Sequence, residues 1–257
     1  MAAEPRVILD ITRTLRRVRH AHASGIDRVE RAYLRWALGR PALFLARSGN
    51  DWAITGPEGA REILSLAEGA PGRLDLAARL RPDRDGRLRE AEACLRRVAH
   101  RRGRLADLLP SGGVYLTVGH VNTDPATFAA IRAVGPRPVA MLHDLIPLEH
   151  PDFATEAATE EAADRLAALT LAALVLTNST DTAERVRDQA MMRGLALPRV
   201  APLPLGIDLA EPEGTPPTQP YFVTLGTIEP RKNHGLLLDI WARFWEQGRR
   251  DIHLHVV

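Results

Sequence analysis

One stretch near the end of the sequence, residues 223–234, constrains the fold more than any other. The apolar run 223–225 reads as a strand, Gly226 opens a turn, and the adjacent cations Arg231 and Lys232 precede an amphipathic helix. A strand that feeds a helix through such a turn places backbone N–H groups at the helix N-terminus, where an anion is stabilised. The alternative is a capped surface turn with two solvated cations, and spacing alone does not separate the two interpretations.

The size and composition are those of an ordinary soluble globular protein. The chain has 257 residues, of which 45% are hydrophobic and 26% charged, which allows one large domain or two smaller ones. The net charge of +2 is too small to indicate a nucleic-acid partner. Cys94 is the only cysteine, no signal peptide is recognisable, and the uncharged, Ala- and Thr-rich stretch 166–179 is too short to span a bilayer. We therefore expect a cytoplasmic protein.

The first thirty residues predict the start of a parallel sheet. Residues 6–12 form a short apolar run that fits a buried strand. An Arg- and His-rich loop, residues 13–22, follows it, and Ser24 then caps a helix whose apolar residues recur at helical spacing. Gly25 stands at this junction, where it either serves a binding site or only lets the loop turn.

Polar side chains follow two predicted strands in the middle of the chain. One strand ends before His120 and Asn122, and the next ends before His143 and Asp144. The carboxyl ends of parallel strands face the cleft in which α/β proteins bind ligands. A lone histidine is usually a structural hydrogen-bonding group, but two at comparable positions favour a site.

A third predicted strand, residues 174–177, ends before Asn178 and Ser179. These side chains either line the same cleft or cap the helix that follows, and both roles are compatible.

The region between these strands carries two charged features. Asp83 and Asp85 lie in a turn-rich segment and do not end an apolar strand, so we interpret them as solvated and expect no metal site. A basic cluster ends the predicted helix 87–101. Its members are Arg96, Arg97, Arg101, Arg102 and Arg104. They form either a solvated face or a peripheral contact with anionic lipid at the inner face of the membrane.

The most linker-like composition in the chain lies at residues 211–220, which are rich in Pro, Glu, Gly and Thr. We therefore predict a first domain over residues 1–210, a linker over 211–220, and the start of a second domain over 221–257.

Four segments of the chain resemble one known family in the order that the family has them. They are residues 25–30, 143–147, 205–208 and 226–233, the last being the most specific. They resemble the retaining GT-B glycosyltransferases of family 4, also known as glycosyltransferase group 1. The resemblance implies an α/β, GT-B-like fold: a Rossmann-like N-terminal domain with a parallel sheet, then the first β-α-β unit of a second Rossmann-like domain. It implies transfer of a hexose from a nucleotide-diphosphate-sugar to a glycan or lipid-linked acceptor in surface polysaccharide synthesis, with retention of configuration and without a metal or other cofactor.

The same resemblance implies a role for each site residue. The catalytic residues are His143 and Asp144. The donor phosphates are bound by Gly25, Gly226, Thr227, Arg231 and Lys232. The acceptor is contacted by Asp27, Arg28, His120, Asn122, Asn178 and Ser179.

The sequence departs from the family in one respect. In the family an acidic pair seven residues apart, further along the second domain, binds the donor, and this sequence ends before that region. Two strands and one helix cannot bury both faces of a sheet. We therefore expect a fragment or a chain completed by a second polypeptide, with little or no transferase activity alone.

Two other classes of function remain alternatives. A non-catalytic module could bind a glycan or a partner through the first domain alone. A nicotinamide-dependent Rossmann enzyme is disfavoured because no Gly-x-Gly-x-x-Gly follows the first strand.

Overall fold

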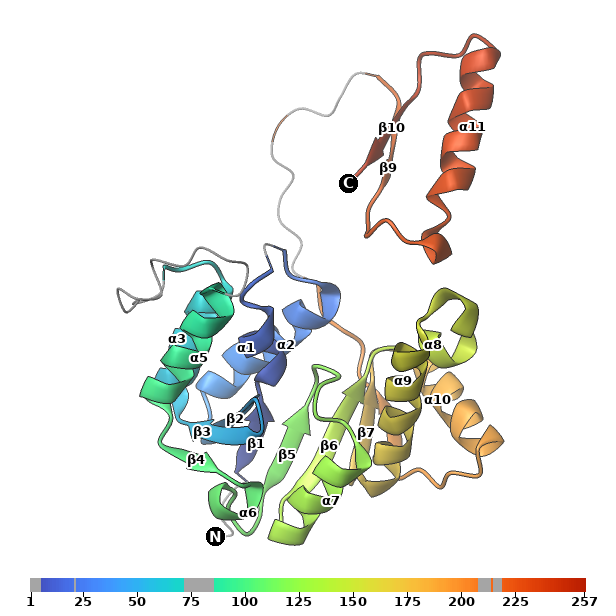
Figure 1. Cartoon of the computed structure of the whole chain (residues 1–257). Coiled ribbons are helices and arrows are strands. Elements are labelled where there is room, and N and C mark those ends of the chain that lie inside the picture. The colour runs from blue at the N-terminus through green and yellow to red at the C-terminus, as the bar shows by residue number, and fades with distance from the viewer. Residues whose placement is uncertain (1–5, 21, 72–85, 208–213, 215–218) are drawn as a thin grey trace.

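The structure is a computed structural model that describes residues 6–20, 22–71, 86–207, 214 and 219–257. Its fold is α/β, as predicted, and is built on a mostly parallel eight-stranded sheet with the order β4-β3-β2-β1-β5-β6-β7-β8 (Figure 1). Among the described strands of this sheet, only β3 runs in the opposite direction, and it pairs antiparallel with β2 and β4. The strands are β1 (Val7–Asp10), β2 (Ala42–Ser48), β3 (Asp51–Thr55), β4 (Arg101–Gly103), β5 (Val114–Thr117), β6 (Arg137–Leu142), β7 (Leu174–Thr177) and β8 (Val200–Pro202).

Helices cover both faces of this sheet because successive strand residues point to opposite sides. Ile8 and Leu9 of β1 illustrate this, since each is fully buried but belongs to a different core cluster. One core packs against α1 (Thr12–Arg17), α2 (Gly25–Leu38), α3 (Pro57–Ala67) and α5 (Gly86–Val98). The other packs against α6 (Leu105–Leu108), α7 (Pro125–Val134), α9 (Glu156–Ala168) and α10 (Thr180–Met192). The short helices α8 (Ile146–Glu149), η1 (Pro151–Phe153) and η2 (Leu169–Leu171) connect these elements.

The prediction of an Arg- and His-rich loop over residues 13–22 is wrong in its first half, where the structure has α1. Leu15 and Val18 are buried in the core, so one side of this short helix is apolar although arginines dominate its sequence. Gly25 is the first residue of α2, and its backbone does not adopt a positive φ. The backbone conformation at position 25 therefore does not require glycine.

The predicted helix 87–101 is too long, because α5 ends at Val98 and residues 101–103 form β4. The basic cluster is thus divided between a helix end and a strand that pairs with β3. Part of its charge is neutralised, since Arg97 forms an ion pair with Glu62 and Arg102 with Asp51. Asp83, Asp85 and most of the linker 211–220 lie outside the described residues.

Residues 219–257 form a smaller unit with a sheet of its own, in which β9 (Tyr221–Thr224) and β10 (His253–Val256) pair in parallel. The crossover between them is made by η3 (Pro230–Lys232) and α11 (His234–Glu246), as the sequence predicts. Trp241 of α11 packs edge-to-face on Phe222 of β9, with ring centroids 5.6 Å apart, and donates a hydrogen bond to the carbonyl of Ile252. These contacts hold the helix on one face of the strand pair.

Candidate functional site

The histidines that follow β5 and β6 lie side by side at the carboxyl edge of the large sheet. Their strands are neighbours in register, with Thr117 opposite Ala140, so the residues beyond their ends meet. The backbone N–H of His143 donates to Nε2 of His120 at 2.9 Å, and the two ring centroids are 4.9 Å apart. The structure therefore brings together the two histidines that the sequence places at strand ends.

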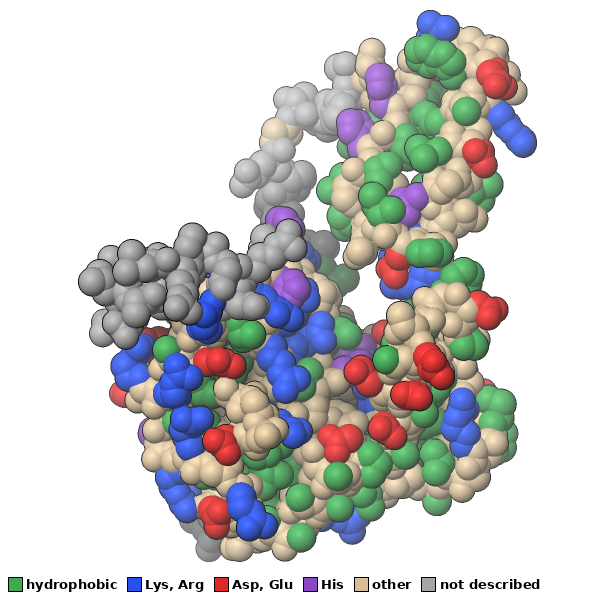
Figure 2. Space-filling model, viewed as in Figure 1, with side chains coloured by type: hydrophobic (Ala, Val, Ile, Leu, Met, Phe, Trp, Pro, Cys, Tyr) green, Lys and Arg blue, Asp and Glu red, His purple; other side chains and the backbone are tan. Residues whose placement is uncertain are grey.

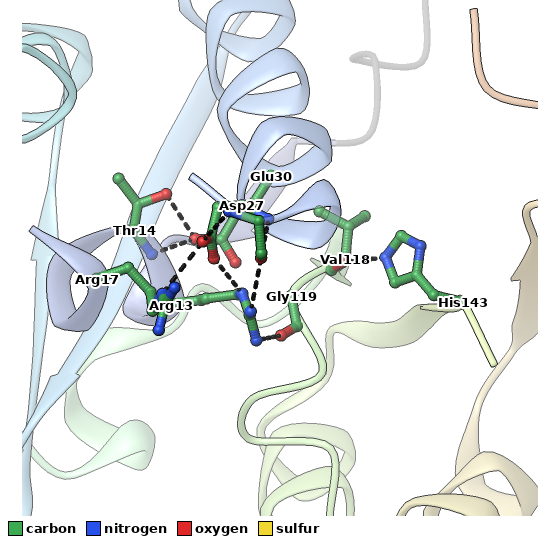
Figure 3. A network of polar contacts seen from close by, with 9 residues as sticks. Arg13, Thr14, Arg17, Asp27, Glu30, Val118, Gly119 and His143 are labelled. Carbon is green, nitrogen blue, oxygen red and sulfur yellow. Dashed lines mark hydrogen bonds and ion pairs between the residues drawn. The ribbon is translucent and has the colours of Figure 1, made fainter. Parts of the chain in front are cut away.

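The hydrogen bonds of His143 determine which ring nitrogen carries the proton. Its Nε2 lies 2.8 Å from the carbonyl oxygen of Val118, which can only accept (Figure 3). Nε2 is therefore the protonated nitrogen, and Nδ1 is left as an acceptor. Burial lowers the pKa of His143, and it lowers the pKa of His120 well below its usual value. Both rings are neutral at neutral pH, so Nδ1 of His143 can accept a hydrogen bond but cannot donate one.

The loop that carries His120 is held in a strained conformation. His120 and Asn122 have φ values of 58° and 56°, in the left-handed region that L-residues rarely adopt. The Asn122 side chain donates from Nδ2 to Asp10 at 2.8 Å and to Thr12 at 2.9 Å. These buried bonds stabilise the loop conformation that aims His120 at the backbone of His143.

A second network ties the same loop to α1 and α2 (Figure 3). The Arg13 guanidinium donates to Asp27 at 2.6 Å, to the carbonyl of Gly119 at 3.2 Å and to Ser24 at 3.2 Å. Burial acts to raise the pKa of Asp27, but the Ser24 backbone N–H and the charge of Arg13 outweigh it, and the pKa is lowered. Asp27 thus stays ionised, caps α2 and holds Arg13, and both of its carboxylate oxygens are engaged.

A buried carboxyl group, Glu30, lies directly beneath this loop. It accepts from the backbone N–H and the hydroxyl of Thr14 at 2.6 and 2.7 Å. Burial raises its pKa to about 8, so it is protonated at neutral pH. A Cβ on Gly119 would lie 2.0 Å from Glu30 Oε2. Only glycine lets the loop after β5 approach this group.

The N-terminus of α10 closes the other side of the edge. Ser179 caps this helix by accepting from the N–H of Thr182 at 3.0 Å, so the capping role predicted for it is confirmed. Asn178 accepts from the Thr182 hydroxyl at 2.8 Å. A cavity of about 300 Å³ opens beside these residues and Asp144. Its lining is Asp144, Leu145, Ile146, Glu149, His150, Asp181, Thr182 and Arg185.

Arg165 of α9 is a residue at this edge that sequence reasoning missed. Its Nε is buried and has no hydrogen-bond partner among the described residues. Burial lowers its pKa, which the negative charge of Asp144 opposes, and the charge of Arg165 in turn lowers the pKa of His120 and of His143. The available signal was its position within the stripe of apolar residues that α9 buries, next to Leu166.

The cationic turn of the smaller unit has a defined geometry. Arg231 forms a two-point ion pair with Glu229, from Nε at 2.9 Å and from Nη2 at 2.7 Å. The ammonium of Lys232 folds back over Gly226, since a Cβ there would lie 3.2 Å from Nζ. Gly226 has a φ of 149°, which other residues rarely adopt. Asn233 ends the turn and caps α11 by accepting from the N–H of Leu236.

Lys232 is also the only lysine among the 34 cationic Lys and Arg residues of the whole sequence. A compact, strongly hydrated ammonium and a planar guanidinium are not interchangeable. The turn after β9 is thus the one place in the chain that carries an ammonium rather than a guanidinium.

The predicted site residues thus fall into two groups. One group lies at the carboxyl edge of the large sheet or in the first turn of α2, where Gly25 and Arg28 are exposed. The other group consists of Gly226, Thr227, Arg231 and Lys232 in the turn after β9. Among the described residues no cluster of three or more His, Cys, Asp or Glu side chains is placed to hold a metal ion.

Comparison with known proteins does not assign the chain to a family, since no protein-family model and no curated protein matches it. Within the described ranges, none of the helices has the length and apolar character needed to cross a membrane.

Proposed function

We propose that this protein is a retaining glycosyltransferase that transfers a hexose from a nucleotide-diphosphate-sugar to a glycan or lipid-linked acceptor in surface polysaccharide synthesis. The observation that carries the proposal is the turn after β9, in which the single lysine lies over Gly226 beside an oriented arginine. The resemblance of this turn to the donor-binding turn of family 4 supports the same assignment.

The chemistry of the turn fits a departing diphosphate. Sugar transfer breaks the anomeric C–O bond, and negative charge develops on the leaving phosphate. A cation about 4 Å from a phosphate oxygen contributes about 4 kcal/mol at an effective dielectric of about 20. Lys232 supplies a point charge, and Glu229 fixes the Arg231 guanidinium while leaving its Nη1 without a partner among the described residues. Cations that are oriented before the reaction stabilise the developing charge without reorganisation.

The carboxyl edge of the large sheet supplies the contacts to sugar and acceptor in this proposal. Nδ1 of His143 accepts a hydrogen bond from a hydroxyl of the transferred sugar. Its neighbour Asp144 lines the cavity of about 300 Å³ next to α10. His120 and Asn122 act through the loop that they shape, and Asp27 acts through Arg13. Direct acceptor contacts then come from Arg28, Asn178 and Ser179, which lie in the first turn of α2 and before α10.

A chromosomal Lys232→Ala substitution in the native host tests the proposal in the protein as the cell makes it. We expect loss of one surface polysaccharide and accumulation of its unextended acceptor. Arg250→Ala is the matched control, because this arginine belongs to the same unit but stacks on Trp245 beyond the far end of α11. Normal polysaccharide in the Lys232→Ala strain would contradict the proposal. If His143→Gln abolished the polysaccharide while Lys232→Ala left it normal, a glycan-binding module would explain the results better than a transferase.

A further inference from the structure

A second cavity in the large unit is lined by residues that have no role in the proposed reaction. It has a volume of about 390 Å³ and lies where α1, α2, α3 and α5 meet. Its lining is Val18, Arg19, His20, Arg31, Ala67, Glu68, Gly69 and Arg87. Arginine side chains gather over this half of the unit (Figure 2).

The positive charge in this cavity is not balanced by the carboxylate that shares it. Glu68 already forms an ion pair with Arg35, which does not line the cavity. Arg31 has no hydrogen bond or ion pair to any described residue, and its Nε is buried. Arg87 donates from Nη2 to the carbonyl of Leu66 at 2.9 Å, which positions its guanidinium without neutralising it.

His20, which lines the same cavity, has a lowered pKa. The pKa of His20 is lowered by burial and then by the positive charges of Arg17 and Arg19, although Asp27 opposes them. Cations that disfavour a further positive charge also favour an anion bound near them.

We propose that this cavity binds a phosphate group of a ligand through Arg31 and Arg87. The buried Nε of Arg31 is an N–H donor left unsatisfied. A phosphate oxygen would satisfy it with a short, charge-assisted bond. The planar fork of arginine suits phosphate better than it suits a lone halide ion. The volume is within the range of small-ligand sites, about 300 to 1,000 Å³, so the cavity accepts a phosphate together with part of the group that it esterifies.

This inference does not rest on the proposed transferase function. The cavity shares no residue with the turn at Arg231 and Lys232, and none with the His143 edge. Its test is therefore designed so that the proposed donor site cannot contribute.

The experiment uses the full chain carrying Arg231→Ala and Lys232→Ala, titrated with inorganic pyrophosphate in a calorimeter. We expect measurable binding that Arg31→Gln weakens about tenfold, the loss of one charge-assisted contact. Arg87→Gln gives a second variant, and circular dichroism verifies that both fold. Arg132→Gln is the matched control, since Arg132 lines a different cavity of about 300 Å³ and also donates to a backbone carbonyl, that of Leu171.

The source of the phosphate is resolved by a second measurement, sedimentation with phosphatidylcholine vesicles that contain a polyprenyl phosphate. Binding to these vesicles that Arg31→Gln removes assigns a lipid-borne phosphate, whereas binding of pyrophosphate alone assigns a soluble one. Equal pyrophosphate affinity in the Arg31→Gln, Arg87→Gln and Arg132→Gln proteins, or no binding of either probe, would overturn the inference.

Discussion

The backbone N–H of His143 donates to the imidazole of His120, so the residue after β6 is positioned by the side chain after β5. His143 in turn contacts the carbonyl of Val118 through Nε2. These two hydrogen bonds link the residues that follow the adjacent strands β5 and β6. One consequence is that the acceptor face of His143, at Nδ1, is determined by its neighbours before any ligand binds.

His143→Gln tests the role of this acceptor. Glutamine retains an N–H that can reach the Val118 carbonyl but loses the Nδ1 acceptor. We expect sugar transfer in cell extracts to fall by at least about tenfold, the loss of one hydrogen bond to substrate, with thermal stability almost unchanged. His253→Gln, a change at an exposed histidine at the start of β10, serves as the control. Full activity in the His143→Gln protein would remove His143 from the site.

Arg165→Gln tests whether the cation on α9 acts on the histidine pair. The charge of Arg165 contributes to the lowered pKa of His120 and His143, so its removal raises both pKa values. The measurement is an NMR titration of the imidazole protons in the variant and in the unmodified protein. Arg193→Gln, at the residue that follows α10 and bonds to Gln189, provides a comparison. Identical titrations in all three proteins would show that Arg165 has no such influence.

Glu30 makes the stability of the fold depend on pH. Its pKa is raised from 4.5 to about 8, so between these values the unfolded chain has released a proton that the folded chain keeps. The free energy of unfolding therefore falls as pH rises through this window, and the contribution is fully present only below the unfolded pKa. We measure the free energy of unfolding by urea denaturation across this pH window. We expect it to fall less in Glu30→Gln than in the unmodified protein, by more than about 1 kcal/mol. Parallel pH profiles in the two proteins would show that Glu30 ionises normally.

Gly119→Ala tests the close approach of the loop after β5 to the carboxyl beneath it. The new Cβ would lie 2.0 Å from Glu30 Oε2 and 3.0 Å from Cβ of Arg13, and neither neighbour is free to move. We expect destabilisation of about 1 to 3 kcal/mol, as for overpacking elsewhere. Gly112→Ala is the control, because nothing lies within 4 Å of its Cβ position and its φ is not positive. Equal stability of the two variants would contradict this packing.

The parallel strands, and the meeting of polar groups at their carboxyl ends, were predictable because apolar runs and strand ends can be read directly from the sequence. The prediction was wrong where a polar sequence forms regular structure. Helix α1 buries Leu15 and Val18 under a surface of arginines, and β4 is an arginine-rich edge strand whose structure comes from pairing with β3. Local composition does not reveal either element.

The orientation of the site residues was not predictable for a different reason. The protonated nitrogen of His143 depends on the direction of the Val118 carbonyl, and the position of His120 depends on a φ of 58°. Arg165 belongs to a helix that reads as Ala-rich and structural, so its place beside Asp144 follows only from how α9 packs. Such contacts are properties of the tertiary structure.

The most direct measurement of the central claim uses the fact that Lys232 is the only lysine. Reductive methylation with ¹³C-formaldehyde keeps the charge and labels one side chain, whose NMR signal is distinct from that of the terminal amine. The account predicts that a nucleoside diphosphate shifts this signal saturably, and that the matching nucleoside monophosphate does so more weakly. A Lys232 signal that no nucleoside diphosphate in a panel of all common bases can move would contradict the account.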